Sequence, residues 1–253
     1  MKKIILFISI LSTCVAFAQD GNMTDEQGRK QGLWKKYHPN GMLRYEGNFK
    51  DDKPVGVFKY YYDTGKIQAK MTHFGPEAYS NMYYETGELK ATGKYENQEK
   101  DSIWTYYDVD GHTMAEEFYL SGKKEGTWKV YFPNGKVAEE KNYTSNVEDG
   151  EWKQYFENGK VKMTATYVQG ALEGRATYYD AAGKKAISGT FYHDVREGYW
   201  TYYEKDGITV KKKEQYEKGK RIDANKDDVI EDPNAIEKES EDILNPDNFY
   251  SPR

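Results

Sequence analysis

Cysteine is almost missing from this sequence, which contains a single one, Cys14, among 253 residues. Because Cys14 lies in the apolar segment at the start, the rest of the chain has no thiol and cannot form a disulfide. Proline is also scarce, with 7 residues, and after the first 18 residues no apolar stretch is long enough to cross a bilayer. These absences exclude a disulfide-stabilised fold, thiol chemistry and, beyond that first segment, a transmembrane helix.

Histidine is equally sparse, and the arrangements that support catalysis are not found. The four histidines share no repeat position and have no ligand spacing to one another: His38, His73, His112 and His193. No glycine-rich phosphate loop precedes a predicted helix, and no Gly-x-Ser-x-Gly motif occurs. We therefore predict a non-enzymatic protein with no catalytic residues, no cofactor and no metal site.

The charge is nearly balanced, with a formal net charge of −5. Lysines recur along the chain, but acidic residues match them in number. A nucleic-acid partner is disfavoured, because binding to phosphates requires a net basic surface. Residues 221–253 hold ten acidic and four basic side chains and little apolar content, so we predict an acidic, disordered tail.

What the sequence does contain is a repeated motif, Gly-x-Trp-x-x-Tyr-x-x-Asn-Gly, as in residues 150–159. Copies begin at residues 32, 56, 78, 102, 126, 150, 174 and 198, so every step is 24 residues except the second, which is 22. We number positions from these starting residues. Position 6 is tyrosine in all eight copies: Tyr37, Tyr61, Tyr83, Tyr107, Tyr131, Tyr155, Tyr179 and Tyr203. Position 10 is always glycine, and such regularity indicates a true internal repeat.

Each copy has the pattern of a β-hairpin. Its first segment is rich in aromatic residues and threonine, which favour strands, and Asn-Gly or Asp-Gly then marks a tight turn. A second strand follows and ends on an aromatic residue, which arrives one position late in the second and eighth copies, as Phe74 and Tyr216. Because a single hairpin is marginally stable, neighbouring copies must stack. The sequence therefore predicts an all-β, elongated antiparallel ribbon or solenoid of about eight hairpins over residues 32–220.

Position 3 carries all five tryptophans, and three copies depart there: Phe58, Ser80 and Ala176. We expect the repeated tryptophans and tyrosines together to form the aromatic core of the ribbon. The third copy departs most, since Gly75-Pro76-Glu77 replaces the usual connection and Ser80 replaces tryptophan. A bend is the favoured interpretation of Ser80, and a notch for a partner is the alternative; the same two apply to Ala176.

Further aromatic residues occur at positions that vary between copies, and we expect some of them to face solvent. Exposed tyrosine suits protein interfaces or stacking on sugars. These residues are the candidate binding residues: Tyr60, Tyr62, Tyr84, Tyr106, Phe132, Phe156, Tyr178 and Tyr202.

One stretch approaches a calcium-binding pattern. Asp108, Asp110, Gly111 and Glu117 match positions 3, 5, 6 and 12 of an EF-hand loop. Tyr106 stands at the first ligand position, where it supplies no carboxylate, and the repeat already accounts for Gly111. Calcium binding is therefore not expected.

The two ends differ from the repeats. Residues 1–18 have a basic start, an apolar centre and a small-x-small cleavage site, which predicts a secretory signal peptide. A lipoprotein anchored at Cys14 is the less favoured alternative, because Thr13 precedes the cysteine. Residues 19–31 resemble the end of a repeat and are expected to cap the first hairpin.

The motif resembles the MORN-repeat variant of bacteria, and the chain is similar to proteins grouped as YwqK-like antitoxins. The resemblance covers residues 25 to about 222. A looser resemblance is to aromatic repeats that bind choline in cell walls, as in Ile103-Trp104-Thr105-Tyr106-Tyr107, although the period there is near 20.

The leading hypothesis is an exported, periplasmic or outer-membrane-associated repeat protein that binds or scaffolds another envelope protein. The alternatives are a cell-wall glycan-binding module and, as the family resemblance implies, an antitoxin or immunity protein.

Overall fold

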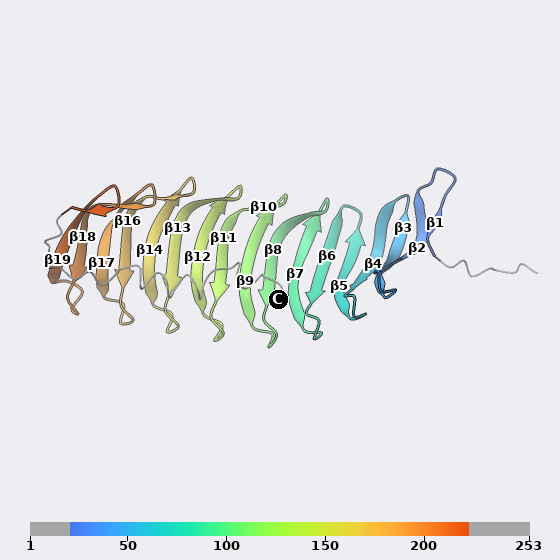
Figure 1. The fold of residues 1–253 in the computed structure, drawn as a ribbon, viewed down its shortest axis with the longest axis horizontal. Helices are drawn as coiled ribbons and strands as arrows, with labels where there is room; N and C mark the ends of the chain where they lie inside the picture. The colour runs from blue at the N-terminus through green and yellow to red at the C-terminus, as the bar shows by residue number, and fades with distance from the viewer. Residues whose placement is uncertain (1–20, 223–253) are drawn as a thin grey trace, which may run out of the picture.

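The computed structural model describes residues 21–222, which form one open antiparallel sheet of 20 strands (Figure 1). No helix occurs in this part of the chain. Figure 1 shows the strands lying side by side across the long axis, with the chain advancing steadily from one end to the other. The predicted stack of hairpins is confirmed. The predicted signal peptide, with the alternative anchor Cys14, lies outside the described residues, as does the predicted acidic tail beyond Ile222.

The strands follow the chain in order, and sixteen longer strands form the eight hairpins. Their bounds are β1 (Met23–Thr24), β2 (Lys30–Tyr37), β3 (Leu43–Lys50), β4 (Lys53–Tyr61), β5 (Ile67–Phe74), β6 (Glu77–Tyr83), β7 (Leu89–Glu96), β8 (Glu99–Tyr107), β9 (Thr113–Leu120), β10 (Lys123–Lys124), β11 (Gly126–Tyr131), β12 (Val137–Thr144), β13 (Val147–Tyr155), β14 (Val161–Val168), β15 (Ala171–Leu172), β16 (Gly174–Tyr179), β17 (Lys185–Tyr192), β18 (Val195–Tyr203), β19 (Val210–Glu217) and β20 (Lys220–Arg221).

The hairpin turns explain the glycine at position 10. In the second copy the amide of Gly65 donates to the carbonyl of Tyr62, and the amide of Tyr62 donates to the carbonyl of Lys66. Gly65 has a φ of 84°, in the left-handed region that a side chain makes costly. Asparagine at position 9 supports the turn, since the Oδ1 atom of Asn158 accepts from the amide of Lys160. Local hydrogen bonding therefore accounts for the Asn-Gly pair.

The 24-residue step contains a bulge between consecutive hairpins. Lys141 of β12 pairs with Trp152 of β13, whereas Tyr143 pairs with Glu148, so between these pairs one residue of β12 faces three of β13. The glycine or serine at position 1 lies within each such bulge at positive φ; Ser102, for example, has a φ of 61°. A two-residue excess recurs at every junction between hairpins except the second.

The second junction lacks the bulge, which explains its 22-residue step. β5 and β6 pair continuously from Ala69 opposite Met82 to Phe74 opposite Glu77. Ala78 stands at position 1 there and is not among the residues with positive φ. The missing two residues are thus the bulge itself, and the sheet continues without interruption.

Other turns connect successive hairpins at the opposite ends of the strands from the hairpin turns. These connecting turns are hydrogen-bonded to one another. Asn146 has a φ of 75°, and its amide donates to the carbonyl of Lys124 one repeat earlier. In return, the Oδ1 atom of Asn146 accepts from the Lys124 amide at 2.7 Å. The amide of Gly170 donates to the carbonyl of Glu148 in the same way. Bonds of this kind join each turn on this side to the turn before it, except between the turn at residues 74–77 and the turn at residues 50–53.

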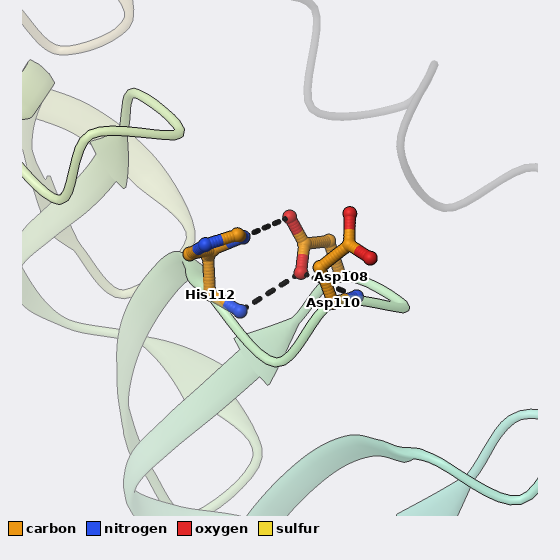
Figure 2. A group of neighbouring side chains, drawn as sticks. All are labelled: Asp108, Asp110 and His112. Carbon is orange, nitrogen blue, oxygen red and sulfur yellow. Dashed lines mark hydrogen bonds and ion pairs between the residues drawn. The ribbon is translucent and has the colours of Figure 1, made fainter.

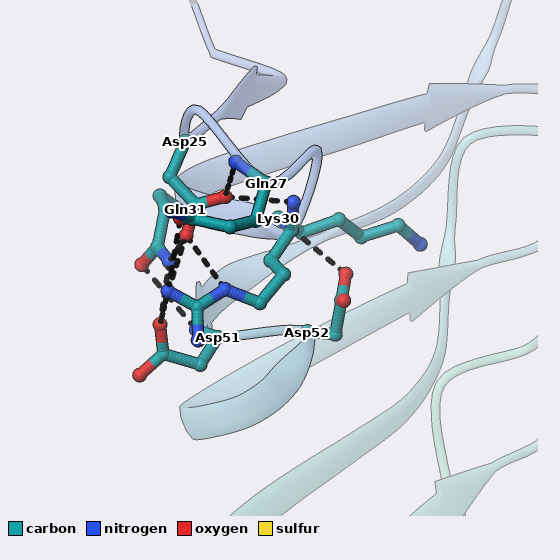
Figure 3. Close-up of polar contacts among 7 residues, drawn as sticks. Asp25, Gln27, Lys30, Gln31, Asp51 and Asp52 are labelled. Carbon is teal, nitrogen blue, oxygen red and sulfur yellow. Dashed lines mark hydrogen bonds and ion pairs between the residues drawn. The ribbon is translucent and has the colours of Figure 1, made fainter.

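A short hairpin arm covers part of the free edge of β2. Strand β1 pairs with Lys30 and Gln31, and Asn22 exchanges two hydrogen bonds with the backbone of Lys35. Figure 3 shows the polar network at the turn between β1 and β2, where Asp25 accepts a hydrogen bond from Gln31. Asp25 also accepts a hydrogen bond from the Arg29 guanidinium. These bonds occupy edge groups that would otherwise be open for pairing.

The two faces of the sheet differ, and one expectation about them is wrong. Positions 3 and 6 have opposite parity on one strand, so their side chains lie on opposite faces. The tryptophans form the core of one face. The repeated tyrosines lie on the other face, where the hydroxyl groups of three of them donate to carboxylates of the preceding repeat. These pairs are Tyr61 with Glu46, Tyr131 with Glu116 and Tyr155 with Glu140.

Packing in the core depends on size complementarity between position 16 of one repeat and position 3 of the next. Gly93 lies under the ring of Trp104, and Gly189 lies under Trp200, so that a Cβ at either glycine would collide with the indole. Both tryptophans are fully buried. A glycine at position 16 therefore makes room for a large ring in the following hairpin.

Each tryptophan also carries a cation over its ring. Lys100 lies 4.6 Å from the ring centroid of Trp104, and Arg196 lies 4.2 Å from that of Trp200. The three repeats without tryptophan lack this cation, having proline or leucine two residues before position 1. The ring and its cation thus occur together, as expected for a cation–π pair.

Ser80 and Ala176 do not form notches, because both are buried. Ala176 belongs to one core cluster with Met163 and Ala165 of the preceding repeat. The expectation for Phe74 is also wrong. His73 occupies the closing position opposite Gly56 and contacts the ring of Phe58, whereas Phe74 is exposed.

A carboxyl group of the fifth repeat lies in the core beside the tryptophan of the sixth. Glu139 is buried and accepts a hydrogen bond from Trp152 Nε1 at 2.5 Å. Lys141 lies 5.1 Å from the Trp152 ring and 2.9 Å from Glu148, so it replaces the usual cation. Burial raises the pKa of Glu139, although Lys141 and the Trp152 hydrogen bond oppose the shift.

We expect Glu139→Gln to remove a pH dependence of stability. The raised pKa means that the folded chain holds this proton more tightly, so wild-type stability falls as pH rises through the folded pKa. Glutamine keeps the acceptor for Trp152 but cannot ionise. Urea unfolding should show the variant gaining on the wild type between pH 4 and pH 7.5. Glu157→Gln, at an exposed position, is the control; equal pH slopes for Glu139→Gln and the wild type would contradict the prediction.

Candidate interaction surfaces

The predicted binding aromatics are less exposed than expected. Tyr106 is buried, and the other seven are half-buried: Tyr60, Tyr62, Tyr84, Phe132, Phe156, Tyr178 and Tyr202. All eight occupy positions 5 or 7, which share the parity of the tryptophans and hence lie on the core face. The structure therefore does not assemble them into an exposed row, and their role in binding stays a prediction.

Two of these tyrosines have a structural contact that joins neighbouring repeats. The Tyr62 hydroxyl donates to the carbonyl of Tyr83 at 2.8 Å, and the Tyr84 hydroxyl donates to that of Tyr107 at 2.7 Å. Burial raises the pKa of both hydroxyls, with nearby acidic residues adding to the shift. Position 7 thus ties each of these hairpin turns to the next one.

An exposed apolar stripe lies on the opposite face of the first four repeats. It consists of the residues at position 2, namely Leu33, Val57, Tyr79 and Ile103, whose exposed fractions are 41%, 49%, 50% and 57%. They lie on β2, β4, β6 and β8, so one strand separates each from the next and their spacing is about 10 Å. Phe74 extends the stripe, because its ring centroid lies 6.1 Å from that of Tyr79.

The stripe ends at the fifth repeat. Position 2 there is Thr127, and the next two copies have Glu151 and Arg175. The repeat architecture therefore tolerates polar side chains at this position, and the core does not require apolar ones.

Asn48, Thr72 and Lys94 of the intervening strands stand opposite the stripe residues, so the stripe is a row of apolar side chains on a mixed surface. Exposed apolar residues gathered on one face of a folded protein mark interaction sites. The sequence analysis selected binding residues by their aromatic character, and it missed the stripe because only one of the four residues is aromatic.

A groove lies on the core face between the first two hairpins. It has a volume of about 490 Å³ and is lined by Lys36, His38, Arg44, Tyr45, Tyr60 and Gln68. The rings of Tyr45 and Tyr60 are 6.0 Å apart. Of these residues, only Tyr60 was singled out as a binding residue from the sequence.

The near-match to a calcium loop forms a turn in which three possible ligand groups meet. Figure 2 shows the side chains of Asp108, Asp110 and His112 drawn together on the loop after β8. Asp108 Oδ1 accepts from the amides of Asp110 and His112, and Oδ2 lies 3.0 Å from His112 Nδ1. Burial acts to raise the pKa of Asp108, but the hydrogen bonds from His112 lower it overall.

This turn does not require an ion to explain its geometry. Asp180 occupies the same position of the seventh repeat and accepts two backbone amides in the same way, from Ala182 and Lys184. Glu117, the expected twelfth ligand, is buried in the core and bonds to Tyr119. These contacts are therefore those of an ordinary hairpin turn of the repeat.

Residues 21–222 include no helix of the length and apolar character needed to cross a membrane. The fold and its surfaces define a β-hairpin repeat protein, in which exposed positions vary while turns and core positions recur.

The family model described as MORN repeat variant matches four segments of this chain, at residues 30–51, 54–74, 124–144 and 148–169. Repeats of this kind generally mediate interactions with proteins or membranes. The matched segments belong to the first, second, fifth and sixth hairpins, and the structure shows the same architecture in the four others. No curated protein matches the chain.

Among solved structures, the crystal structure of TarM is 14% identical, with a TM-score of 0.25, over 49% of this chain and 20% of that one. A mutant of S. aureus TarM in complex with Fondaparinux, alpha-GlcNAc-glycerol and UDP is 14% identical, with a TM-score of 0.24, over 47% of this chain and 19% of that one. The chain thus spans about a fifth of these relatives. A likeness this low supports no argument about function.

Proposed function

We propose that this chain is an exported, non-enzymatic repeat protein that binds another protein of the bacterial envelope. The observation that carries the proposal is the stripe of Leu33, Val57, Tyr79 and Ile103 on four consecutive repeats. The signal-like sequence of residues 1–18 supports export. The repeat supplies a rigid scaffold, and the stripe supplies an apolar surface that a partner buries.

The polar face around the stripe favours a protein partner. Lys59 lies on β4 and Glu77 on β6, two of the strands that carry the stripe. Lys94 of β7 stands opposite Tyr79 and forms an ion pair with Glu77 at 3.2 Å. An apolar centre with a charged, solvent-accessible border is the usual composition of a protein interface. The glycan alternative predicts an exposed row of aromatic residues, and the candidate aromatics do not form one. That alternative therefore depends on the groove between the first two hairpins.

The test is a crosslinked pull-down from the native envelope with residues 19–253 tagged at the C-terminus, followed by an affinity measurement on the captured protein. The stripe variant replaces Leu33, Val57, Tyr79 and Ile103 with threonine, the residue that the fifth repeat has at this position. One dominant partner is expected, with at least a tenfold loss of affinity in the stripe variant.

A matched control replaces other exposed apolar residues, Leu120, Val147 and Val168, with threonine. This control should capture the partner as well as the wild type does. Equal capture by the stripe variant and the wild type would refute the role of the stripe in binding. Recovery of no protein above background would refute the proposal of a protein partner.

A further inference from the structure

The groove between the first two hairpins combines cations and tyrosine hydroxyl groups that have no partner among the described residues. Its six lining residues come from β2, from the turn after β2 and from β3, β4 and β5. Its volume of about 490 Å³ falls within the usual range of small-molecule sites. The groove opens on the core face, so it is separate from the apolar stripe.

The first repeat departs from the other copies where the groove forms. Position 14 is Tyr45 in the first copy but alanine in the next three: Ala69, Ala91 and Ala115. A bulge in the hairpin leaves position 13 without a cross-strand partner, and in the first copy this residue is Arg44. Position 14 therefore accepts residues of different size, and in the first copy the ring of Tyr45 packs beside those of Phe58 and Tyr60. Arg44 is exposed and has no partner in the strand pairing.

Two cations in the groove lack a partner. Lys36 and Arg44 are exposed, and neither forms an ion pair with any residue between 21 and 222. No carboxylate lines the groove. By contrast, Lys100 in the fourth repeat bonds to the Tyr106 hydroxyl at 2.6 Å. The first groove thus presents positive charge to an incoming ligand, in a chain with a net charge of −5.

The floor of the groove offers hydroxyl groups and ring surface. Tyr45 and Tyr60 are half-buried, and neither hydroxyl has a hydrogen-bond partner among the described residues. Burial raises the pKa of Tyr60, with Tyr45 contributing, so its hydroxyl stays protonated at neutral pH. His38 is held in place, because its Nε2–H donates to the carbonyl of Tyr61 at 2.9 Å. The amide of Gln68 completes the polar lining.

We infer that this groove binds an acidic saccharide, a sugar that carries a carboxylate. The carboxylate pairs with Arg44 and Lys36, since a guanidinium binds carboxylates through two parallel hydrogen bonds. The sugar hydroxyls bond to Tyr45, Tyr60 and Gln68, and the apolar face of the sugar ring packs against the tyrosine rings. An acidic peptide would pair with the cations but would leave the side chains of Tyr45, Tyr60 and Gln68 without sugar hydroxyls to bind.

The test compares two oligosaccharides that differ in charge. Calorimetric titration of residues 19–253 with a hyaluronan tetrasaccharide, which alternates N-acetylglucosamine and glucuronate, is expected to show saturable binding. Chitotetraose, which is neutral, is expected to bind at least tenfold more weakly. Raising the salt concentration should weaken binding of the acidic ligand, because screening reduces the charge attraction.

Substitutions locate the site. The double variant Lys36→Gln, Arg44→Gln should lose at least tenfold in affinity, and Tyr60→Phe, which removes only a hydroxyl, should lose a few-fold. Lys162→Gln, at the position equivalent to Arg44 in the sixth repeat, should bind like the wild type. Circular dichroism of each variant checks that the fold is kept. We expect the fold to be unchanged, because Lys36 and Arg44 are exposed and form no ion pair with any described residue.

Three results would overturn the proposal: no heat of binding with the hyaluronan probe at millimolar concentration, equal affinity for chitotetraose, or tighter binding of a tetraglutamate peptide. The last result would assign the groove to acidic peptides. Because the groove and the stripe lie on opposite faces, the stripe variant should keep saccharide affinity, so the two proposals fail independently.

Discussion

Replacing Trp104 with alanine is expected to lower the free energy of unfolding by about 3–5 kcal/mol. Its side chain is fully buried, its Nε1 donates to the carbonyl of Lys94 at 3.0 Å, and its ring centroid lies 4.9 Å from that of Tyr95. The space left by the indole lies over Gly93, which has no side chain to fill it. The variant therefore loses transfer energy and gains a cavity.

Urea unfolding followed by far-ultraviolet circular dichroism measures this loss. Hydrogen exchange of β7, β8 and β9 should show the largest local change, because each repeat is supported mainly by its neighbours. Trp34→Ala is the control, since Trp34 is only partly buried in the first hairpin, and it should cost less. A loss below about 1 kcal/mol for Trp104→Ala would contradict the described core.

Adding one methyl group at Gly93 is expected to cost about 2–3 kcal/mol, at the upper end of the range for overpacking. A Cβ at this position would lie 2.2 Å from Cδ2 of Trp104 and 2.3 Å from Cε2. The fully buried indole has no free space into which to move. The measurement is the same urea unfolding, with Gly93→Ala compared directly with the wild type.

A double variant separates a clash with the indole from a general intolerance of a side chain. The junction between the sixth and seventh repeats has alanine at both equivalent positions, Ala165 and Ala176. Gly93→Ala combined with Trp104→Ala recreates that pair. The double variant should therefore lose less stability than the sum of the single variants, by about 1–2 kcal/mol. Simple additivity would show that the clash is not the cause.

The turn and spacing residues carried most of the information about the fold. Glycine at position 10 and the 24-residue step suffice to predict eight stacked hairpins, because a glycine at positive φ and a period of two strands leave few other architectures. Ala78 also contained a signal: as a non-glycine residue at position 1 of the shortened repeat, it marks the junction that has no bulge.

The division of the aromatic residues between two faces was harder to predict. Trp152 and Tyr155 are three residues apart on β13, and strand alternation alone assigns them to opposite faces. Their shared aromatic character suggested one core instead. The Glu140 carboxylate that receives the Tyr155 hydroxyl lies 15 residues away, and pairing it required the register between hairpins.

The candidate surfaces depend on features that local sequence does not reveal. Residues at position 2 become a stripe only when the register aligns four repeats, and Leu33, Val57 and Ile103 are unremarkable singly. The groove depends on the bulge that leaves Arg44 without a partner strand residue. Tyr60 was singled out for its aromatic ring, but the neighbouring cations became evident only in three dimensions.

The neighbour-only pairing of the strands has a mechanical consequence. Strands lie across the long axis of the molecule (Figure 1), and each hairpin is hydrogen-bonded only to the hairpins beside it. Tension between the two ends therefore opens the sheet one strand at a time, like a zipper, instead of shearing many hydrogen bonds at once. Each 24-residue repeat that opens releases roughly 80 Å of chain from a layer about 10 Å thick. A partner fixed at one end would thus be held by an extensible tether that lengthens in steps and shortens again as hairpins re-form.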